Sequence, residues 1–168
     1  MRIRLTHCHD LAQLATVERS AAQAFKRLPE LTWLAQADVL DDATHQRCIA
    51  QQASWVAVDE QDLPIGFICA HTIASELHIL ELSVQEHAQG KGLGRRLLQT
   101  AVEAARSRGL QGVTLTTFTD VPWNAPFYAR QGFTILAPAQ LDERLRGILR
   151  SEQAHGLSGR CAMRLAIG

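Results

Sequence analysis

The sequence has no excess charge of either sign and little aromatic content. Of its 168 residues, 17 are Lys or Arg and 17 are Asp or Glu, and only 5% are aromatic, with a single tyrosine. Proteins that bind nucleic acid phosphates normally carry a basic excess. The even balance therefore argues against a nucleic acid partner, and it also argues against an acidic disordered tail.

Long apolar runs are also missing. No stretch approaches the ~20 apolar residues that span a bilayer, and residues 1–10 lack the apolar segment and small-residue cleavage site of a signal peptide. We therefore expect a cytoplasmic protein without a membrane partner. The apolar content of 46% can supply one core in a chain of this length, so we expect a single domain over residues 1–168.

The cysteines form no CxxC pair, which argues against a zinc knuckle or a redox dithiol. They are far apart, and we expect reduced thiols at Cys8, Cys48, Cys69 and Cys161. His7, Cys8 and His9 are candidate metal ligands, but no partner ligand stands at a helpful spacing, so capping or surface roles are favoured and no metal is expected. No cysteine has the setting of an acyl-enzyme nucleophile.

Apolar periodicity and turn residues predict alternating strands and helices. A helix is predicted to begin at Leu11 after a capping Asp10, and Ile49 and Ala50 are inward candidates on the second helix. Three successive strands indicate an antiparallel half, and a later strand-helix-strand unit indicates a parallel pair. The predicted fold class is α/β, with a mixed sheet and helices on both faces. The predicted strands are 2–6, 54–59, 65–73, 77–84, 113–118, 133–136 and 161–167, and the later helices are 42–52, 93–105, 124–131 and 139–153.

A glycine-rich loop joins the strand 77–84 to the following helix. It reads Gln89-Gly90-Lys91-Gly92-Leu93-Gly94-Arg95. Glycines permit a tight turn and let a ligand approach the backbone, and a helix start offers unpaired N–H groups and a positive dipole end. Together these features predict a phosphate or pyrophosphate site. The alternative is a flexible helix entry.

Two common nucleotide motifs do not fit this loop. The dinucleotide fingerprint GxGxxG fails because Arg95 stands where its third glycine belongs. The NTPase pattern GxxxxGK followed by Ser or Thr is matched nowhere in the chain.

Three segments together resemble the GNAT N-acetyltransferases. Gln89-x-x-Gly92-x-Gly94 matches the family's acetyl-CoA signature, Q/R-x-x-G-x-G/A. Leu82-Ser83-Val84 is similar to the family's fourth strand, and residues 127–133, Phe-Tyr-Ala-Arg-Gln-Gly-Phe, are similar to its downstream segment. The specific likeness covers about residues 76–136.

The resemblance implies acetyl transfer from acetyl-CoA to an amine. In the family, the loop amides hold the CoA pyrophosphate, which here assigns Gln89, Gly90, Lys91, Gly92, Leu93, Gly94 and Arg95. The fourth and fifth strands splay apart around the pantetheine arm, which here places Leu82, Ser83 and Val84 beside it. A main-chain N–H directed at the thioester oxygen stabilises the charge of the tetrahedral intermediate. Homodimerisation is also implied by the resemblance.

Two residues are candidates for proton transfer. Tyr128 aligns with the family tyrosine that protonates the departing thiolate, and its alternative role is ring packing. An alkylamine must lose a proton before it attacks, and Glu81, in an otherwise apolar strand, is the candidate base. Its alternative role is an ion pair or a solvated carboxylate. His78 is a second candidate base, on the opposite face by strand alternation, and a bulge would change that alternation.

Other positions depart from the family pattern or stay open. The family's usual CoA-contacting asparagine is Val121 here, and Asn124 either contacts CoA one turn later or caps the short helix. The charged residues of segment 137–160 either form a solvated helix face or line the acceptor site. Trp33 is the aromatic candidate for the acceptor side, whereas Trp55 is expected in the core.

The sequence leaves the acceptor open between a small-molecule amine and a protein N-terminus or lysine. The main rival to catalysis is a GNAT domain that senses acetyl-CoA without turnover. Tyr128 and Glu81 favour an enzyme that uses direct attack by the amine.

Overall fold

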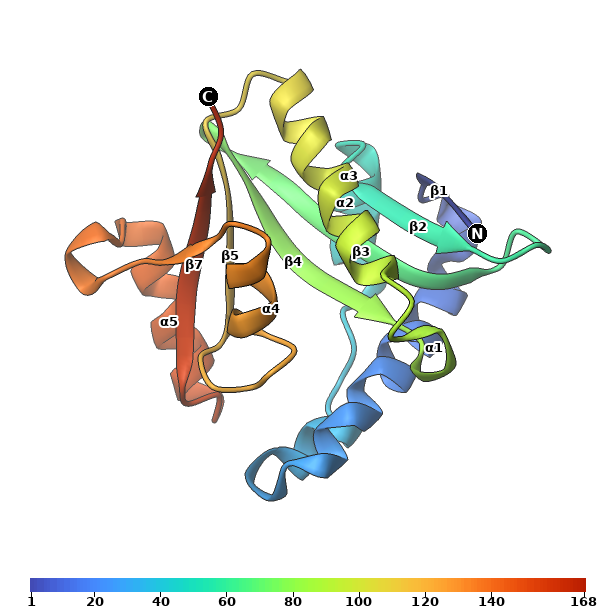
Figure 1. The fold of residues 1–168 in the computed structure, drawn as a ribbon, viewed down its shortest axis with the longest axis horizontal. Helices are drawn as coiled ribbons and strands as arrows, with labels where there is room; N and C mark the ends of the chain where they lie inside the picture. Colours follow the sequence, from blue (N-terminus) through green and yellow to red (C-terminus); the bar gives the residue numbers. More distant parts are fainter. The chain divides into compact units, whose positions relative to one another are not determined.

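The computed structural model describes the chain from Met1 to Gly168 (Figure 1), and the chain forms two compact units. Unit 1 comprises Met1–Thr72 and Ile79–Ala104, and unit 2 comprises Ile73–His78 and Ala105–Gly168. The strands are hydrogen-bonded in the order β1-β2-β3-β4-β5-β7-β6, and β4 (Glu76–Val84) contributes residues to both units. The mixed sheet predicted from the sequence is confirmed.

Unit 1 is built on β1 (Arg2–Leu5), β2 (Ser54–Val58) and β3 (Pro64–Ile73). β1 pairs antiparallel with β2 from Arg2↔Val58 to Leu5↔Trp55, and β2 pairs antiparallel with β3. The predicted hairpin is therefore present, and its turn is closed by Asp59, whose carboxylate accepts hydrogen bonds from the N–H groups of Gln61 and Leu63.

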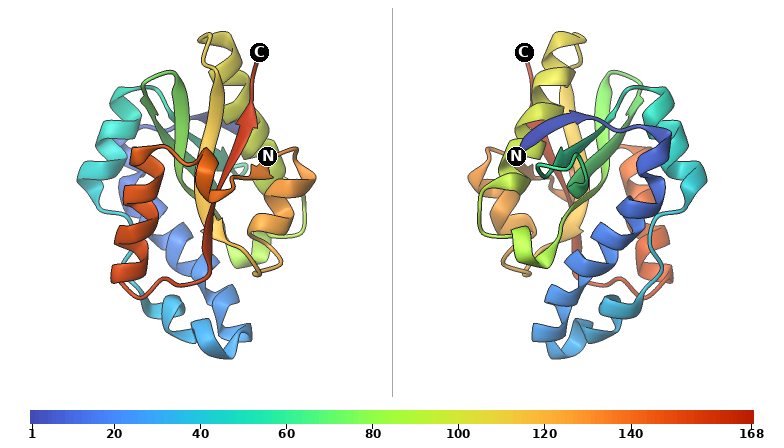
Figure 2. Two further views of the ribbon diagram at one scale, coloured as in Figure 1. Left: turned by 90° about the vertical axis from the view of Figure 1, so that its left-hand side faces the viewer. Right: turned by 90° about the vertical axis from the view of Figure 1, so that its right-hand side faces the viewer.

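Helices cover both faces of these strands, as predicted (Figure 2). They are α1 (Leu11–Ala22), α2 (Asp42–Ala50) and α3 (Leu93–Ser107). Neighbouring residues of a strand point to opposite faces. Phe67 packs with Leu14 of α1 and Cys48 of α2, whereas a Cβ on Gly66 would contact Leu97 of α3. The core of unit 1 therefore lies on both sides of β3.

Two local predictions in unit 1 are wrong. Asp10 makes no side-chain cap for α1; it closes a 3-10 turn, Cys8–Asp10, and pairs with Arg4 instead. Ile49 is half-buried and Ala50 exposed, while His45 and Cys48 are the buried residues of α2. His45 and Cys48 lie three residues apart on one helix face, and this is the face that packs on Phe67 of β3.

The region after α1 is also more broken than the periodicity predicts. The helix ends at Ala22, and two 3-10 segments, Gln23–Arg27 and Pro29–Gln36, follow it. Leu28 between them is extended, as expected before a proline.

Unit 2 contains β5 (Gly112–Phe118), β6 (Thr134–Ile135) and β7 (Arg160–Ala166), with α4 (Ala125–Arg130) and α5 (Glu143–Ala154). The first residues of β4 pair parallel with β5 over Glu76↔Gly112 to His78↔Thr114, which confirms the predicted parallel pair. β5 pairs antiparallel with β7 along its whole length. The short parallel pairing is the pattern expected of two strands that splay apart.

Ionic contacts attach α5 to the strands of unit 2. Glu152 accepts a hydrogen bond from Thr116 Oγ1 at 2.7 Å and pairs with Arg160 at 3.2 Å. Glu76 pairs with Arg164, and its carboxylate lies 3.8 Å from the Arg144 guanidinium. These contacts lie on the partly buried side of the helix, where ion pairs are less screened than on the surface.

A buried histidine makes the stability of unit 1 depend on pH. His45 is 1% exposed, and neither ring nitrogen has a hydrogen-bond partner. Its ring meets Phe67 edge-on at 5.3 Å between centroids. Burial lowers the pKa of His45, against the opposing charges of Asp42 and Asp41. The native imidazole therefore stays neutral at a pH where the unfolded chain takes up a proton.

We predict that the free energy of unfolding decreases as the pH falls below about 6.5, by up to about 1.4 kcal/mol per pH unit. This loss continues until the pH reaches the lowered pKa of native His45. His45→Leu should remove this part of the pH dependence, because only the wild-type unfolded state takes up the extra proton. Urea unfolding across this range measures it, with the exposed His87→Leu as control. An unchanged slope in His45→Leu would contradict the account.

Candidate functional site

The glycine loop follows β4 and leads directly into α3. After Val84, a 3-10 turn covers Glu86–Ala88, and α3 begins at Leu93. Leu93, Leu97 and Leu98 are buried in unit 1, whereas Gln89 to Gly92 are exposed. The helix start is therefore held by its apolar side chains, and the loop before it is open to solvent.

Two glycines give the loop its backbone conformation. Gly90 has φ +76° and Gly92 has φ +80°, values that side-chain-bearing residues rarely adopt. A Cβ built on either glycine would meet no atom within 4 Å. Space beside the loop, rather than contact with the protein, therefore surrounds both positions.

The backbone amides of residues 90–95 donate to no protein acceptor. Gln89 N–H donates to Glu86 O, and Arg96 N–H donates to Gly92 O at 3.1 Å. Between these two bonds, the turn leaves its N–H groups unpaired, as the first turn of a helix does. The Gln89 side chain donates to Val84 O at 2.9 Å and so ties the loop to the end of β4. Unpaired amides of this kind are the donors that an anion site needs, and anion binding at this loop stays a prediction.

The predicted cofactor residues of β4 lie in the same unit. Ser83 is buried, and Leu82 and Val84 are half-buried. Gly66 allows the close approach here, since a Cβ on it would lie 3.2 Å from Ser83 O and 3.4 Å from Val84. The end of β4 is thus packed against β3 and α3, and it provides a rigid base for the loop.

Glu81 lies on β4 beside a serine hydroxyl. It is half-buried, and Ser83 Oγ donates to its Oε1 at 3.1 Å. A hydrogen bond with Cys48 and burial raise the pKa of the Cys69 thiol, and the charges of Glu81 and Glu18 raise it further. Glu81 is therefore close enough to the α1 and α2 side of β3 to influence a core thiol electrostatically.

Unit 1 also contains a cavity that the sequence did not reveal. It has a volume of about 650 Å³ and lies between Arg19 of α1 and the segment 36–44. Asp38 and Asp41 line it, and Thr44 hydrogen bonds lower the pKa of Asp41. Glu18 braces this segment, because its carboxylate accepts the N–H of Leu40 at 3.1 Å. The only sequence signal near this cavity is the aspartate pair 41–42, which predicts the start of a helix and not a cavity.

Tyr128 is a buried residue of α4 in unit 2. It is 9% exposed, and its ring lies edge-on to Phe127 at 5.1 Å and to Phe133 at 5.8 Å between centroids. The backbone carbonyl of Tyr128 accepts the N–H of Phe133, which closes the turn after α4. The Tyr128 ring therefore packs in the core, as the alternative role proposed, and these ring contacts orient its hydroxyl group.

Asn124 occupies the N-cap position of α4 without capping it through its side chain. Its Oδ1 instead accepts the N–H of Phe118 at 3.3 Å, which joins the start of α4 to the end of β5. Val121, at the position of the family asparagine, is buried.

His78 belongs to a polar group inside unit 2. It is buried, and its Nδ1 lies 2.8 Å from Thr114 Oγ1. Arg144 of α5 donates to the same hydroxyl at 3.3 Å. The charged side chains of segment 137–160 thus fall into two sets. Arg144 and Glu152 face β5. The exposed ones are Glu143, Arg146 and Arg150.

Of the tryptophans, Trp55 lies in the core as predicted, and Trp33 is 47% exposed on the second 3-10 segment. In the cluster at the chain start, His7, His9 and Asp10 lie close together. No helix of the structure combines the length and the apolar character needed to cross a membrane.

Comparison with known proteins identifies relatives of this chain. Residues 14–133 match the model of the acetyltransferase (GNAT) family. Peptidyl-lysine N-acetyltransferase YjaB of Salmonella typhimurium is 27% identical over 89 residues, which are 53% of this chain and 55% of that protein. The chain thus matches about half the length of this curated relative.

Solved structures show the same fold. Rv2747 from Mycobacterium tuberculosis, in complex with CoA, has a TM-score of 0.74 at 19% identity. The match covers 100% of this chain and 100% of that one. The PaiA N-acetyltransferase from Thermoplasma acidophilum, also in complex with coenzyme A, has a TM-score of 0.71 at 18% identity, over 99% of this chain and 98% of that one.

Proposed function

Because this chain belongs to the acetyltransferase (GNAT) family, we propose that it transfers the acetyl group of acetyl-CoA to a primary amine of a small molecule or peptide. The observation that carries the proposal is the open glycine turn with unpaired amides before α3. Such a turn suits a diphosphate, because the N–H groups and the helix dipole both favour negative charge. The CoA in the two solved relatives supports this ligand.

The coenzyme is proposed to contact both the loop and the end of β4. The amides of residues 90–95 bind the pyrophosphate, Gln89 supports the loop through its side-chain bond to Val84 O, and the exposed side chains of Lys91 and Arg95 add positive charge. The backbone of Leu82, Ser83 and Val84 lies along the pantetheine arm. Asn124 holds the β5–α4 junction through Oδ1, and we propose that its amide N–H₂ contacts CoA.

Glu81 is proposed to help remove the proton of the acceptor. An alkylammonium with a pKa near ~10 cannot attack a thioester until it is deprotonated. The Glu81 carboxylate, oriented by Ser83 Oγ, accepts this proton directly or through a water. The neutral amine then attacks the thioester carbon, and the tetrahedral intermediate forms without an acyl-enzyme. His78 is the less suitable base, because its Nδ1 is engaged with Thr114.

Tyr128 is proposed to donate a proton to the coenzyme sulfur as the C–S bond breaks. An ordinary phenol has a pKa near ~10 and keeps its proton at neutral pH. A hydrogen bond or proton transfer from this group stabilises the thiolate as it departs. The ring contacts with Phe127 and Phe133 keep the phenol in one orientation, which reduces the cost of aligning the donor.

The acceptor is proposed to carry a positive charge before it reacts. The cavity of unit 1 is lined by Asp38 and Asp41, with Arg19 on its α1 side. Two carboxylates favour an ammonium group, and Arg19 would suit a second, anionic group on the same acceptor. The Salmonella relative is a peptidyl-lysine N-acetyltransferase, so the acceptors to test are peptides that contain lysine as well as small amines.

Several broader expectations stay predictions. They are that units 1 and 2 form one acetyltransferase domain over residues 1–168, that the protein is cytoplasmic, that it forms a homodimer, and that it has neither a nucleic acid nor a membrane partner. Sedimentation of the purified protein measures the oligomeric state.

The first prediction of this mechanism concerns the loop backbone. Gly92→Ala should weaken CoA binding at least about tenfold, because its Cβ enters the space assigned to the pyrophosphate and strains the turn. Gly109→Ala is the matched control, since Gly109 also has a positive φ of +70° and open space around it. Calorimetric titration with CoA measures both affinities. Equal affinity in the two variants would contradict the assignment of the loop.

The second prediction separates the acid role of Tyr128 from its packing role. Tyr128→Phe retains the ring and removes only the hydroxyl, so turnover should fall about 100-fold while the affinity for acetyl-CoA changes by less than about twofold. Steady-state thiol release and calorimetry measure the two quantities. The acid role is wrong if turnover stays within about twofold of the wild type across the pH range.

The third prediction concerns Glu81. Glu81→Gln should lower kcat/KM about 100-fold at neutral pH, and the loss should shrink as the pH rises, because free amine then forms without the base. The exposed Glu60→Gln, in the β2–β3 turn, is the control. A pH profile parallel to that of the wild type would show that Glu81 does not act on the amine proton.

A further inference from the structure

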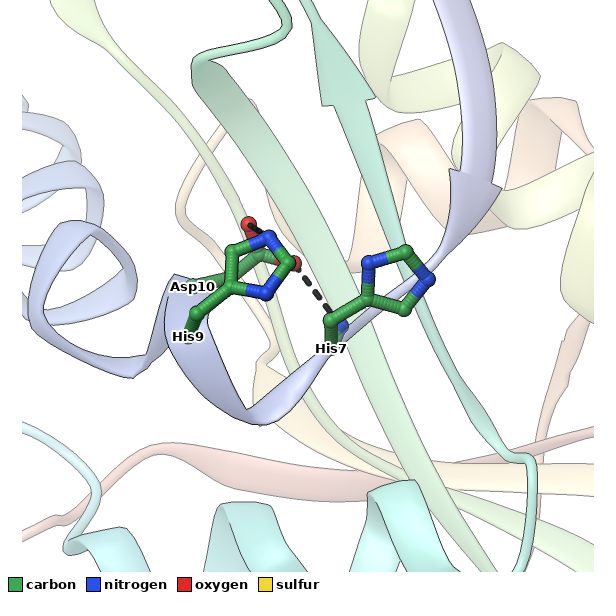
Figure 3. Close-up of side chains that lie close together, drawn as sticks. All are labelled: His7, His9 and Asp10. Carbon is green, nitrogen blue, oxygen red and sulfur yellow. Dashed lines mark hydrogen bonds and ion pairs between the residues drawn. The ribbon is translucent and has the colours of Figure 1, made fainter.

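His7, His9 and Asp10 form a compact group of potential metal ligands where β1 leads into α1 (Figure 3). Each offers one donor atom, and the three atoms lie within 4.8 Å of one another. His7 and His9 are exposed, whereas Asp10 is 3% exposed. The group therefore combines one fixed ligand with two that can move.

Asp10 is fixed by three donors. Its Oδ2 accepts the N–H of His7 at 2.8 Å and Arg4 Nη1 at 2.9 Å, and its Oδ1 accepts Arg4 Nη2 at 3.1 Å. Burial opposes ionisation, but the hydrogen bonds from Arg4 and from His7 N–H outweigh it and lower the pKa of Asp10. The carboxylate therefore stays charged, and hydrogen bonds of this kind commonly orient metal-binding carboxylates.

Oδ1 of Asp10 retains a free direction toward the histidines. A carboxylate oxygen can accept two contacts, and Oδ1 has one hydrogen bond, from Arg4. His9 Nε2 lies 3.7 Å from Oδ1, and the His7 and His9 ring centroids are 5.0 Å apart with planes tilted by 56°. Donors of a tetrahedral zinc ion lie about 3.3 Å apart, given bond lengths near 2.0 Å. Binding would therefore require the two exposed rings to rotate toward Asp10.

The guanidinium of Arg4 does not leave the group with an excess positive charge. Arg4 also binds Asp62, through Nε at 3.0 Å, so its charge is shared between two carboxylates. Arg2 lies 2.7 Å from Asp62 on the exposed side. The charges of the two arginines and two aspartates cancel, and the side chains of His7 and His9 are exposed.

We propose that His7, His9 and Asp10 bind a divalent transition-metal ion such as Zn²⁺, with a water in the fourth position. Two imidazoles and a carboxylate suit Zn²⁺, Ni²⁺ and Cu²⁺ and do not suit the all-oxygen shells of Mg²⁺ or Ca²⁺. The sequence argued against a metal because no third ligand was evident near His7 and His9. Asp10 supplies it, since its carboxylate does not cap α1.

A bound ion would connect the end of β1 to the start of α1. Binding to the folded protein alone stabilises it by mass action, so Zn²⁺ should raise the thermal midpoint. The site is independent of acetyl transfer, because none of its residues belongs to the proposed catalytic or coenzyme-binding set.

The test is calorimetric titration of Zn²⁺ into the full chain, produced without a histidine tag and freed of metal with a chelator. The variants are His7→Ala and His9→Ala, with His87→Ala as the control for an exposed histidine elsewhere. Cys8→Ser excludes the neighbouring thiol as the ligand. Asp10 is left intact, because its loss would also release Arg4. Thermal unfolding with and without Zn²⁺ is the second readout.

The expected result is one Zn²⁺ per chain, with affinity at least about tenfold weaker in His7→Ala and in His9→Ala. His87→Ala and Cys8→Ser should bind Zn²⁺ with the affinity of the wild type. Zn²⁺ should raise the thermal midpoint of these two variants and of the wild type more than that of His7→Ala or His9→Ala. The proposal is overturned if the wild type takes up no Zn²⁺, if binding survives both histidine substitutions, or if Cys8→Ser alone abolishes it.

Discussion

The amides that precede α3 are the constraint on which the proposed chemistry depends. A helix start always leaves N–H groups unpaired, but most proteins cap them with a side chain or expose them to water. Here the two positive-φ glycines turn the chain, a Cβ on either would meet open space, and the amides of residues 90–95 donate to no protein acceptor. The buried Leu93 and Leu97 hold the helix in place behind them. An unsatisfied donor set of this kind can bind an anion without breaking a hydrogen bond inside the protein.

The end of β4 connects this donor set to Glu81, the proposed base. Gln89 hydrogen bonds to Val84, and Ser83 hydrogen bonds to Glu81, so the loop and the carboxylate are both supported by one strand. Close packing at Gly66 limits movement of that strand. The coenzyme and the base would therefore be positioned by the same rigid element, which is an efficient way to bring reactants together.

Much of the fold could be predicted from the sequence, because its strands and helices have clear apolar periodicity and glycine or proline boundaries. The loop 89–95 was identified on the same local grounds. What could not be predicted depends on tertiary contacts that residue spacing does not reveal. Periodicity does not show that the polar His45 is inside, or that Asp10 pairs with an arginine which also binds Asp62. The sequence around Asn124 likewise does not show that its side-chain oxygen accepts the N–H of Phe118.

The measurement that tests the central claim most directly is a two-dimensional ¹H–¹⁵N correlation spectrum of the labelled protein during titration with CoA. The largest shifts should fall on the backbone amides of residues 90–95, because these protons gain phosphate oxygens as acceptors. The exposed amides of the β2–β3 turn, at residues 60–62, should stay unchanged. Saturation with CoA that leaves the amides of residues 90–95 unshifted would contradict the account.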